Sequence, residues 1–105
     1  MPSDFQGLVR ARLVIVPAAS GNLRRSVATD FGACNDLYNA TSDAIAESTV
    51  VGLTTNVLEC LDLDDAFTGI AAGDHVGVAF TRKASHAEDT IEDVVYVLEF
   101  WMQYV

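Results

Sequence analysis

The feature that most constrains the fold is the apolar run over residues 94–105, which continues to the last residue of the chain. Val94 and Tyr96 alternate with Val95 and Val97, and this alternation is typical of a β-strand. Apolar side chains on both faces indicate a strand that lies between two layers. Chain ends are usually polar and frayed, so we expect this strand to be buried in a sheet or against a partner.

A second alternating run, over residues 75–82, is separated from the first by a polar loop. We expect the two runs to pair as a hairpin that organises the fold. Arg82 and Asp89 flank the loop, and a charge-assisted hydrogen bond between them would fix its shape. We therefore interpret Arg82 and Asp89 as a structural hairpin staple, which at an exposed site contributes about 1 kcal/mol or less.

Alternation also predicts strands earlier in the chain, and these are ended by Pro17 and Gly32. The expected strands cover residues 7–16, 23–31, 49–54 and 56–63. Turn residues dominate 35–47, so a loop with about one helical turn is expected there, with another turn over 64–68. Short strands separated by turns indicate an all-β fold, either an antiparallel sandwich or a barrel. We expect one antiparallel, jelly-roll-like β-sandwich domain over residues 1–105.

The composition combines acidity with hydrophobicity. Fifteen acids face six bases, the net charge is −9, and half of the residues are apolar. The basic pairs Arg24-Arg25 and Arg82-Lys83 are isolated, so nucleic-acid binding is not expected. The scarcity of lysine fits either a salt-rich habitat or a GC-rich coding sequence. Apolar runs are too short for a membrane span. No targeting signal is visible, so we expect synthesis in a cytoplasm and any exit from it to be inside an assembly.

An apolar fraction this high suggests more apolar surface than one small domain can bury, which predicts a homo-oligomer; a well-filled core is the alternative. The second face of the last strand carries the only tryptophan, a residue favoured at interfaces. The candidate interface therefore comprises Val95, Val97, Trp101 and Val105.

No motif marks a catalytic or metal site. Cys34 and Cys60 lack metal-ligand spacing and are expected to be buried thiols, with a disulfide as the alternative. His75 and His86 have no further ligands at defined spacing. Neither a nucleophile elbow nor a phosphate-binding loop is present. We expect no enzyme activity, no catalytic residue, no metal and no cofactor.

The C-terminal half, residues 57–105, resembles the closing hairpin of small all-β domains in structural proteins of tailed viruses (bacteriophage-type particles). Such domains occur in fibres, spikes, decoration proteins and neck components. Glu99 departs from the pattern, because such domains often carry glycine there. The matching residues are Gly73, Asp74, Arg82, Asp89, Thr90, Val94, Tyr96, Leu98 and Tyr104.

This resemblance implies a virion structural protein, in particular a small capsid-associated or decoration protein that acts by oligomeric packing. The implied partners are further copies of the chain, with a trimer as the expected state, and other virion proteins such as the major capsid protein. The alternative is a carbohydrate- or receptor-binding module of an adhesin or fibre head. Its candidate residues are Tyr38, Phe67 and Trp101.

Overall fold

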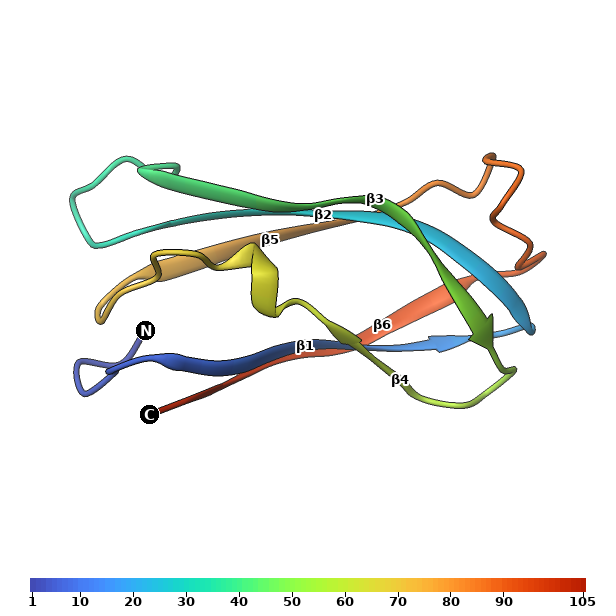
Figure 1. The fold of residues 1–105 in the computed structure, drawn as a ribbon, viewed down its shortest axis with the longest axis horizontal. Helices are drawn as coiled ribbons and strands as arrows, with labels where there is room; N and C mark the ends of the chain where they lie inside the picture. Colours follow the sequence, from blue (N-terminus) through green and yellow to red (C-terminus); the bar gives the residue numbers. More distant parts are fainter.

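A computed structural model describes all residues from 1 to 105 and contains six strands and one 3-10 turn (Figure 1). The predicted all-β class is confirmed. The strands are β1 (Leu8–Pro17), β2 (Gly21–Gly32), β3 (Thr41–Leu53), β4 (Glu59–Asp62), β5 (His75–Arg82) and β6 (Val95–Tyr104), and the turn is η1 (Asp64–Ala66).

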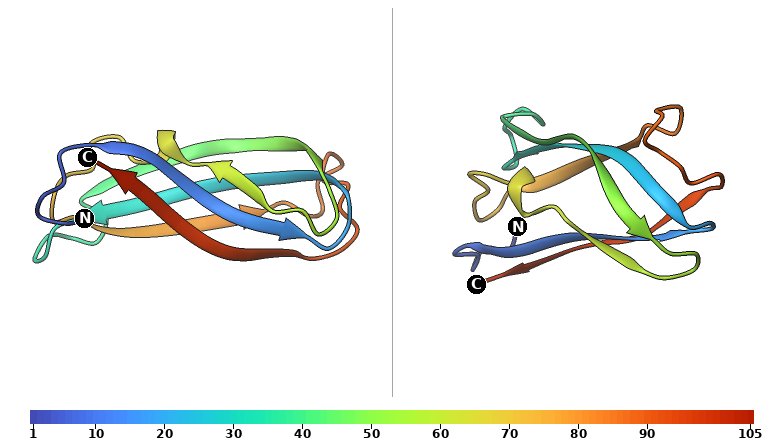
Figure 2. Two further views of the ribbon diagram at one scale, coloured as in Figure 1. Left: turned by 90° about the horizontal axis from the view of Figure 1, so that it is seen from below. Right: turned by 45° about the vertical axis from the view of Figure 1, so that its right-hand side comes forward.

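The strands form two three-stranded antiparallel sheets, with the orders β4-β1-β6 and β3-β2-β5. The sheets lie face to face in a sandwich-like arrangement (Figures 1 and 2). Four of the five connections pass from one sheet to the other, and only β2–β3 stays within a sheet. The molecule is elongated: its radius of gyration is 15.0 Å, against about 13 Å for a compact domain of this length.

The core comes from the alternation of β1 and β2, which presents apolar side chains to the space between the sheets. Leu13 and Ile15 of β1 face Val27 and Phe31 of β2, and each is at most 3% exposed. The segment around η1 adds Leu63, Ala66 and Phe67, which are equally buried and cover the core beside β3 and β4 (Figure 2).

The predicted hairpin between the last two strands is wrong. β5 pairs with β2 and β6 pairs with β1, so the two strands lie in different sheets. The twelve residues 83–94 cross between the layers and are longer than the two to five residues typical of hairpin loops. Alternation identifies a strand but not its partner, and loop length was the signal that argued against local pairing.

Two strand boundaries also differ from the prediction. Residues 35–47 do not form a helical turn, and β3 already begins at Thr41 and follows β2 almost to its end. Pairing with a long central strand here outweighs the weak strand preference of the turn-type residues. In the predicted strand over 56–63, only β4 is paired, because the chain before it forms a turn in which Val57 N–H donates to the Thr54 carbonyl and Asn56 has a φ of 60°.

A β-bulge in β6 changes which side chains face the core. Val14 pairs with Glu99 while the adjacent Ile15 pairs with Val97, which leaves Leu98 as an extra residue. An extra residue reverses the alternation of all side chains beyond it. The sequence contains no glycine or proline that would mark this position, so the prediction carried one uninterrupted alternation through it.

The four residues of the predicted interface consequently do not share one face. Val95 and Val97 pair with core residues of β1 and face inward, whereas Trp101 pairs with Arg12 and faces outward. Val105 lies beyond the strand and is held by backbone hydrogen bonds with Gly7. Whether any of these four contacts another subunit stays a prediction.

Candidate functional site

The outer face of the β4-β1-β6 sheet carries an apolar surface without a partner. Val14 and Val16 alternate with buried residues of β1 and therefore point outward. On β4 the cross-strand neighbour of Val14 is Cys60; on β6 the neighbour of Val16 is Tyr96 and that of Val14 is the charged Glu99, which borders the apolar residues. Leu58 directly precedes β4 and is 60% exposed, and Tyr96 is 57% exposed. We call the five uncharged residues Val14, Val16, Leu58, Cys60 and Tyr96 the outer apolar patch.

Charged residues border the outer apolar patch at one end. Nη1 of Arg12 lies 3.2 Å from Oδ1 of Asp62 and 2.7 Å from Oδ1 of Asp64, and Trp101 sits opposite Arg12 on β6. Burial opposes the ionisation of Asp64, but hydrogen bonds from the Ala11 N–H and from Arg12 outweigh it and lower its pKa. An apolar centre with a polar rim is the usual anatomy of a protein interface.

Arg82 and Asp89 form a bidentate ion pair, with Nε–Oδ2 at 3.1 Å and Nη2–Oδ1 at 2.9 Å. The Asp89 side chain is 0% exposed. Arg82 also donates to the carbonyl oxygens of Ile91 and Asp93, and Asp89 accepts from the backbone N–H of Arg24. The pair therefore anchors the crossover 83–94 to β2 and β5, and it is not a staple across a hairpin.

The ion pair shifts the ionisation of both partners. Hydrogen bonds from Arg82 lower the pKa of Asp89, and the Arg24 N–H lowers it further against the opposing effect of burial. The same contact raises the pKa of Arg82. Asp89 therefore remains a carboxylate when it is removed from water, because the charge is matched and both oxygens accept hydrogen bonds.

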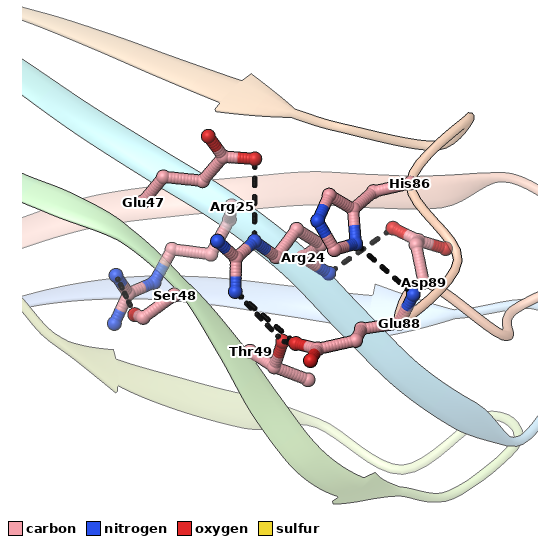
Figure 3. Close-up of polar contacts among 8 residues, drawn as sticks. All are labelled: Arg24, Arg25, Glu47, Ser48, Thr49, His86, Glu88 and Asp89. Atoms are coloured by element: carbon pink, nitrogen blue, oxygen red, sulfur yellow. Dashed lines mark hydrogen bonds and ion pairs between the residues drawn. The ribbon is translucent and has the colours of Figure 1, made fainter.

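A second polar network lies on the outer side of β2 (Figure 3). Arg24 Nε is 3.2 Å from Glu47 and its Nη1 is 3.1 Å from Glu88. The hydroxyl of Thr49 donates to Glu88 at 2.6 Å and, as the largest influence, lowers the pKa of that carboxyl. Arg24 and Arg82 are therefore both paired with acids: Arg82 with Asp89 of the crossover, and Arg24 with Glu88 of the crossover and Glu47 of β3.

Arg25 carries the one buried side-chain nitrogen or oxygen atom that has no hydrogen-bond partner. It lies directly opposite Arg82 in the β2–β5 register, and its only side-chain hydrogen bond runs from Nη1 to Ser48 Oγ at 3.0 Å (Figure 3). Its Nε is buried without a partner, and burial lowers the pKa of the guanidinium. Like charges directly opposite each other repel, and the carboxylate of Asp89 offsets this repulsion between Arg25 and Arg82.

The chain has one pocket, of about 380 Å³, where the β2–β3 loop meets the start of β5. Cys34 Sγ lies 3.2 Å from His75 Nε2 there, and Asp36 and the exposed ring of Tyr38 also line it. The prediction of buried thiols is wrong, since both Cys34 and Cys60 are exposed and unbridged. No set of three or more His, Cys, Asp or Glu side chains is arranged to hold a metal ion.

The outer apolar patch was partly visible in the sequence. The second face of β1 changes from Arg10 and Arg12 to Val14 and Val16, which indicates a surface with a charged end and an apolar end. The contributions of Cys60 and Tyr96 could not be predicted, because they depend on β4 and β6 both pairing with β1.

The chain matches no protein-family model, no curated protein and no solved structure. None of its helical segments reaches the length and hydrophobicity that a membrane-crossing helix requires.

Proposed function

We propose that this chain is a structural subunit of a tailed-virus particle, a small capsid-associated or decoration protein that acts by oligomeric packing. The observation that carries the proposal is the outer apolar patch with its charged border at Arg12, Asp62 and Asp64. Only 15 of 105 residues are buried in the isolated chain. A flat apolar face on a small acidic domain suits burial against copies of itself, with a trimer as the proposed state.

The proposal includes a jelly-roll-like fold. The eight strands of a jelly roll, lettered B to I along the chain, form the sheets B-I-D-G and C-H-E-F. If β1 to β6 stand for D to I, those sheets reduce to G-D-I and F-E-H, which is the order of the two sheets here. The single connection within a sheet, β2–β3, then falls at E–F. This coincidence supports a jelly roll without its first two strands.

The proposed role requires no catalytic group and no cofactor, so we propose that the protein is not an enzyme. The ion pairs at Arg12, Arg24 and Arg82 each hold separate strands or loops together, which is a structural task. The partners of the protein, besides copies of itself, would be other virion proteins such as the major capsid protein.

The test is incorporation into particles purified from the host that carries the gene. We expect the chain as a stoichiometric component, and we expect Tyr96→Glu to remove it, because a carboxylate in an apolar interface is unpaired. Val51→Glu, on the exposed side of β3, serves as the matched control and should be retained. Particles that lack the chain, or that retain both variants equally, would contradict the proposal.

A carbohydrate- or receptor-binding module is the second candidate, and the pocket favours it. Tyr38 is 79% exposed beside Asp30 and Asp36, a combination of ring and acceptors that suits a sugar. Phe67 is 3% exposed and cannot contribute. If Tyr38→Ala abolishes binding to host glycans while the subunit stays on the particle, binding is a function of the pocket.

A further inference from the structure

One side of the two-layer molecule has two free strand edges. β5 pairs only with β2, and β6 pairs only with β1. Both lie on the same side, opposite β3 and β4, as the left view of Figure 2 shows. Each edge presents backbone N–H and C=O groups without partners in the sheet, which is a template for a further strand.

The core is also incomplete on this side. Val97 pairs with the fully buried Ile15 and faces inward, yet it remains 53% exposed. The inward side chains of β5, such as Val78, are only partly buried. On the opposite side η1 and Phe67 close the core, and Phe67 is 3% exposed. One side is therefore covered by the chain itself, and the other is not.

The β6 edge has only two of the features that normally protect a free strand, the charge of Glu99 and the bulge at Leu98. Glu99 is the only charged residue between Val95 and Tyr104, and no proline interrupts the strand. Natural edge strands are usually shortened, charged or covered to prevent pairing. A ten-residue, largely apolar edge with one charge and one bulge is weakly protected, which favours its being covered by another strand in the working assembly.

We propose that the β5/β6 side binds an extended, β-forming segment of a different protein, antiparallel to β6, with apolar residues at alternate positions and basic residues at its ends. The inference rests on the jelly-roll-like arrangement proposed above, in which the missing strands B and C pair with I and H, here β6 and β5. Addition of a strand to an edge is a common mode of peptide recognition.

The carboxylates near the two edges favour a segment with basic ends from a different protein over a second copy of the chain. Four carboxylates flank the two edges, and none is paired with a cation: Asp74, Glu92, Asp93 and Glu99. Lys83 is the only lysine nearby. Edge-to-edge pairing of two copies would place these unpaired carboxylates against those of the other copy, whereas a segment with basic ends complements them.

The test uses two synthetic peptides of about ten residues, the length of β6, each alternating valine and threonine. One carries two lysines at each end and the other two glutamates. We expect the basic peptide to bind the full chain at least about tenfold more tightly by calorimetry. Hydrogen exchange should slow at β5 and β6 and not at β3.

Two variants locate the site. Leu98→Lys, at the exposed bulge, should weaken binding of the basic peptide about tenfold or more through like-charge repulsion. Val51→Lys, on the free edge of β3, should leave the affinity within about twofold. Glu99→Lys, at the exposed position next to the bulge, provides a second edge variant if circular dichroism shows that Leu98→Lys is unfolded.

Equal affinities for the two peptides, or equal losses in Leu98→Lys and Val51→Lys, would overturn the proposal. A dimer of the peptide-free chain that Leu98→Lys dissociates would instead assign the edge to a second copy. The outcome is separable from the proposed function, because Tyr96→Glu should abolish oligomeric packing without weakening the binding of the basic peptide. Normal packing without peptide binding would refute this inference alone.

Discussion

At the scale of single residues, the Arg82–Asp89 contact is the one ion pair in which both carboxylate oxygens bind the same arginine. Asp89 is fully buried and accepts three hydrogen bonds from Arg82 and the Arg24 N–H. We expect Asp89→Asn to lower the free energy of unfolding by about 3–5 kcal/mol, because it leaves Arg82 without its counter-charge. Urea unfolding measures this, with Asp93→Asn as the exposed control; equal stability of the two variants would contradict it.

Reversing the pair should not restore stability. Arg82 also donates to the carbonyls of Ile91 and Asp93, which an aspartate at position 82 would repel. The N–H of Arg24 would in turn face an arginine at position 89. We therefore expect the double variant Arg82→Asp, Asp89→Arg to be no more stable than Asp89→Asn. Recovery of most of the wild-type stability in a double-mutant cycle would show that the pair acts alone.

The lowered pKa of Asp89 fixes the direction of the pH dependence. A folded-state pKa below the unfolded value contributes stability that is present above about pH 4, the ordinary value for aspartate, and is lost as the pH falls through the folded value. Glu88, bonded by Thr49, acts in the same direction. Urea midpoints should fall from pH 5 to about pH 3, and a midpoint that stays constant or rises would contradict this assignment.

At the scale of elements, the segment around η1 packs between the two sheets and contacts both. The ring of Phe67 lies 6.2 Å from that of Phe31 and 5.8 Å from that of Phe100, so it contacts both layers. Phe67→Ala should cost about 3–5 kcal/mol through lost contacts and a cavity. Tyr38→Ala, on an exposed loop, should change stability by less than about 0.5 kcal/mol in the same urea experiment. Similar losses in both would mean that Phe67 is not a core residue.

The sequence predicted elements better than their pairing. Alternation located β1, β2, β5 and β6 within a residue or two, and Pro17 marked an end correctly. It could not assign β5 and β6 to different sheets, because partners depend on the whole chain. The bulge at Leu98 has no marker residue, and it moved half of the predicted interface to the inner side.

In the candidate site, contacts between residues close in sequence could be predicted, and contacts between distant residues could not. Arg82 and Asp89 are close along the chain, so their contact could be proposed from spacing. Arg24 and Glu88 are far apart, and their contact requires the crossover to return to β2. The outer apolar patch likewise joins three strands that are distant in sequence.

At the scale of the whole molecule, charge and hydrophobicity oppose each other. Each copy carries a net charge of −9, so packing of copies through the outer apolar patch works against long-range repulsion. Salt screens that repulsion, and the Debye length falls from about 10 Å at 0.1 M to about 3 Å at 1 M. We expect association to strengthen with added NaCl in sedimentation, and association that weakens with salt would indicate an interface of complementary charges.

The most direct test of the central claim is the solution mass of the wild-type chain, Tyr96→Glu and Val51→Glu, measured by light scattering at one concentration and salt. The account predicts a multiple of 11.3 kDa, threefold for a trimer, for the wild-type chain and Val51→Glu. Tyr96→Glu should be a folded monomer, because its carboxylate occupies the outer apolar patch. A wild-type monomer at every concentration, or a Tyr96→Glu variant that retains the full oligomer mass, would contradict packing through this face.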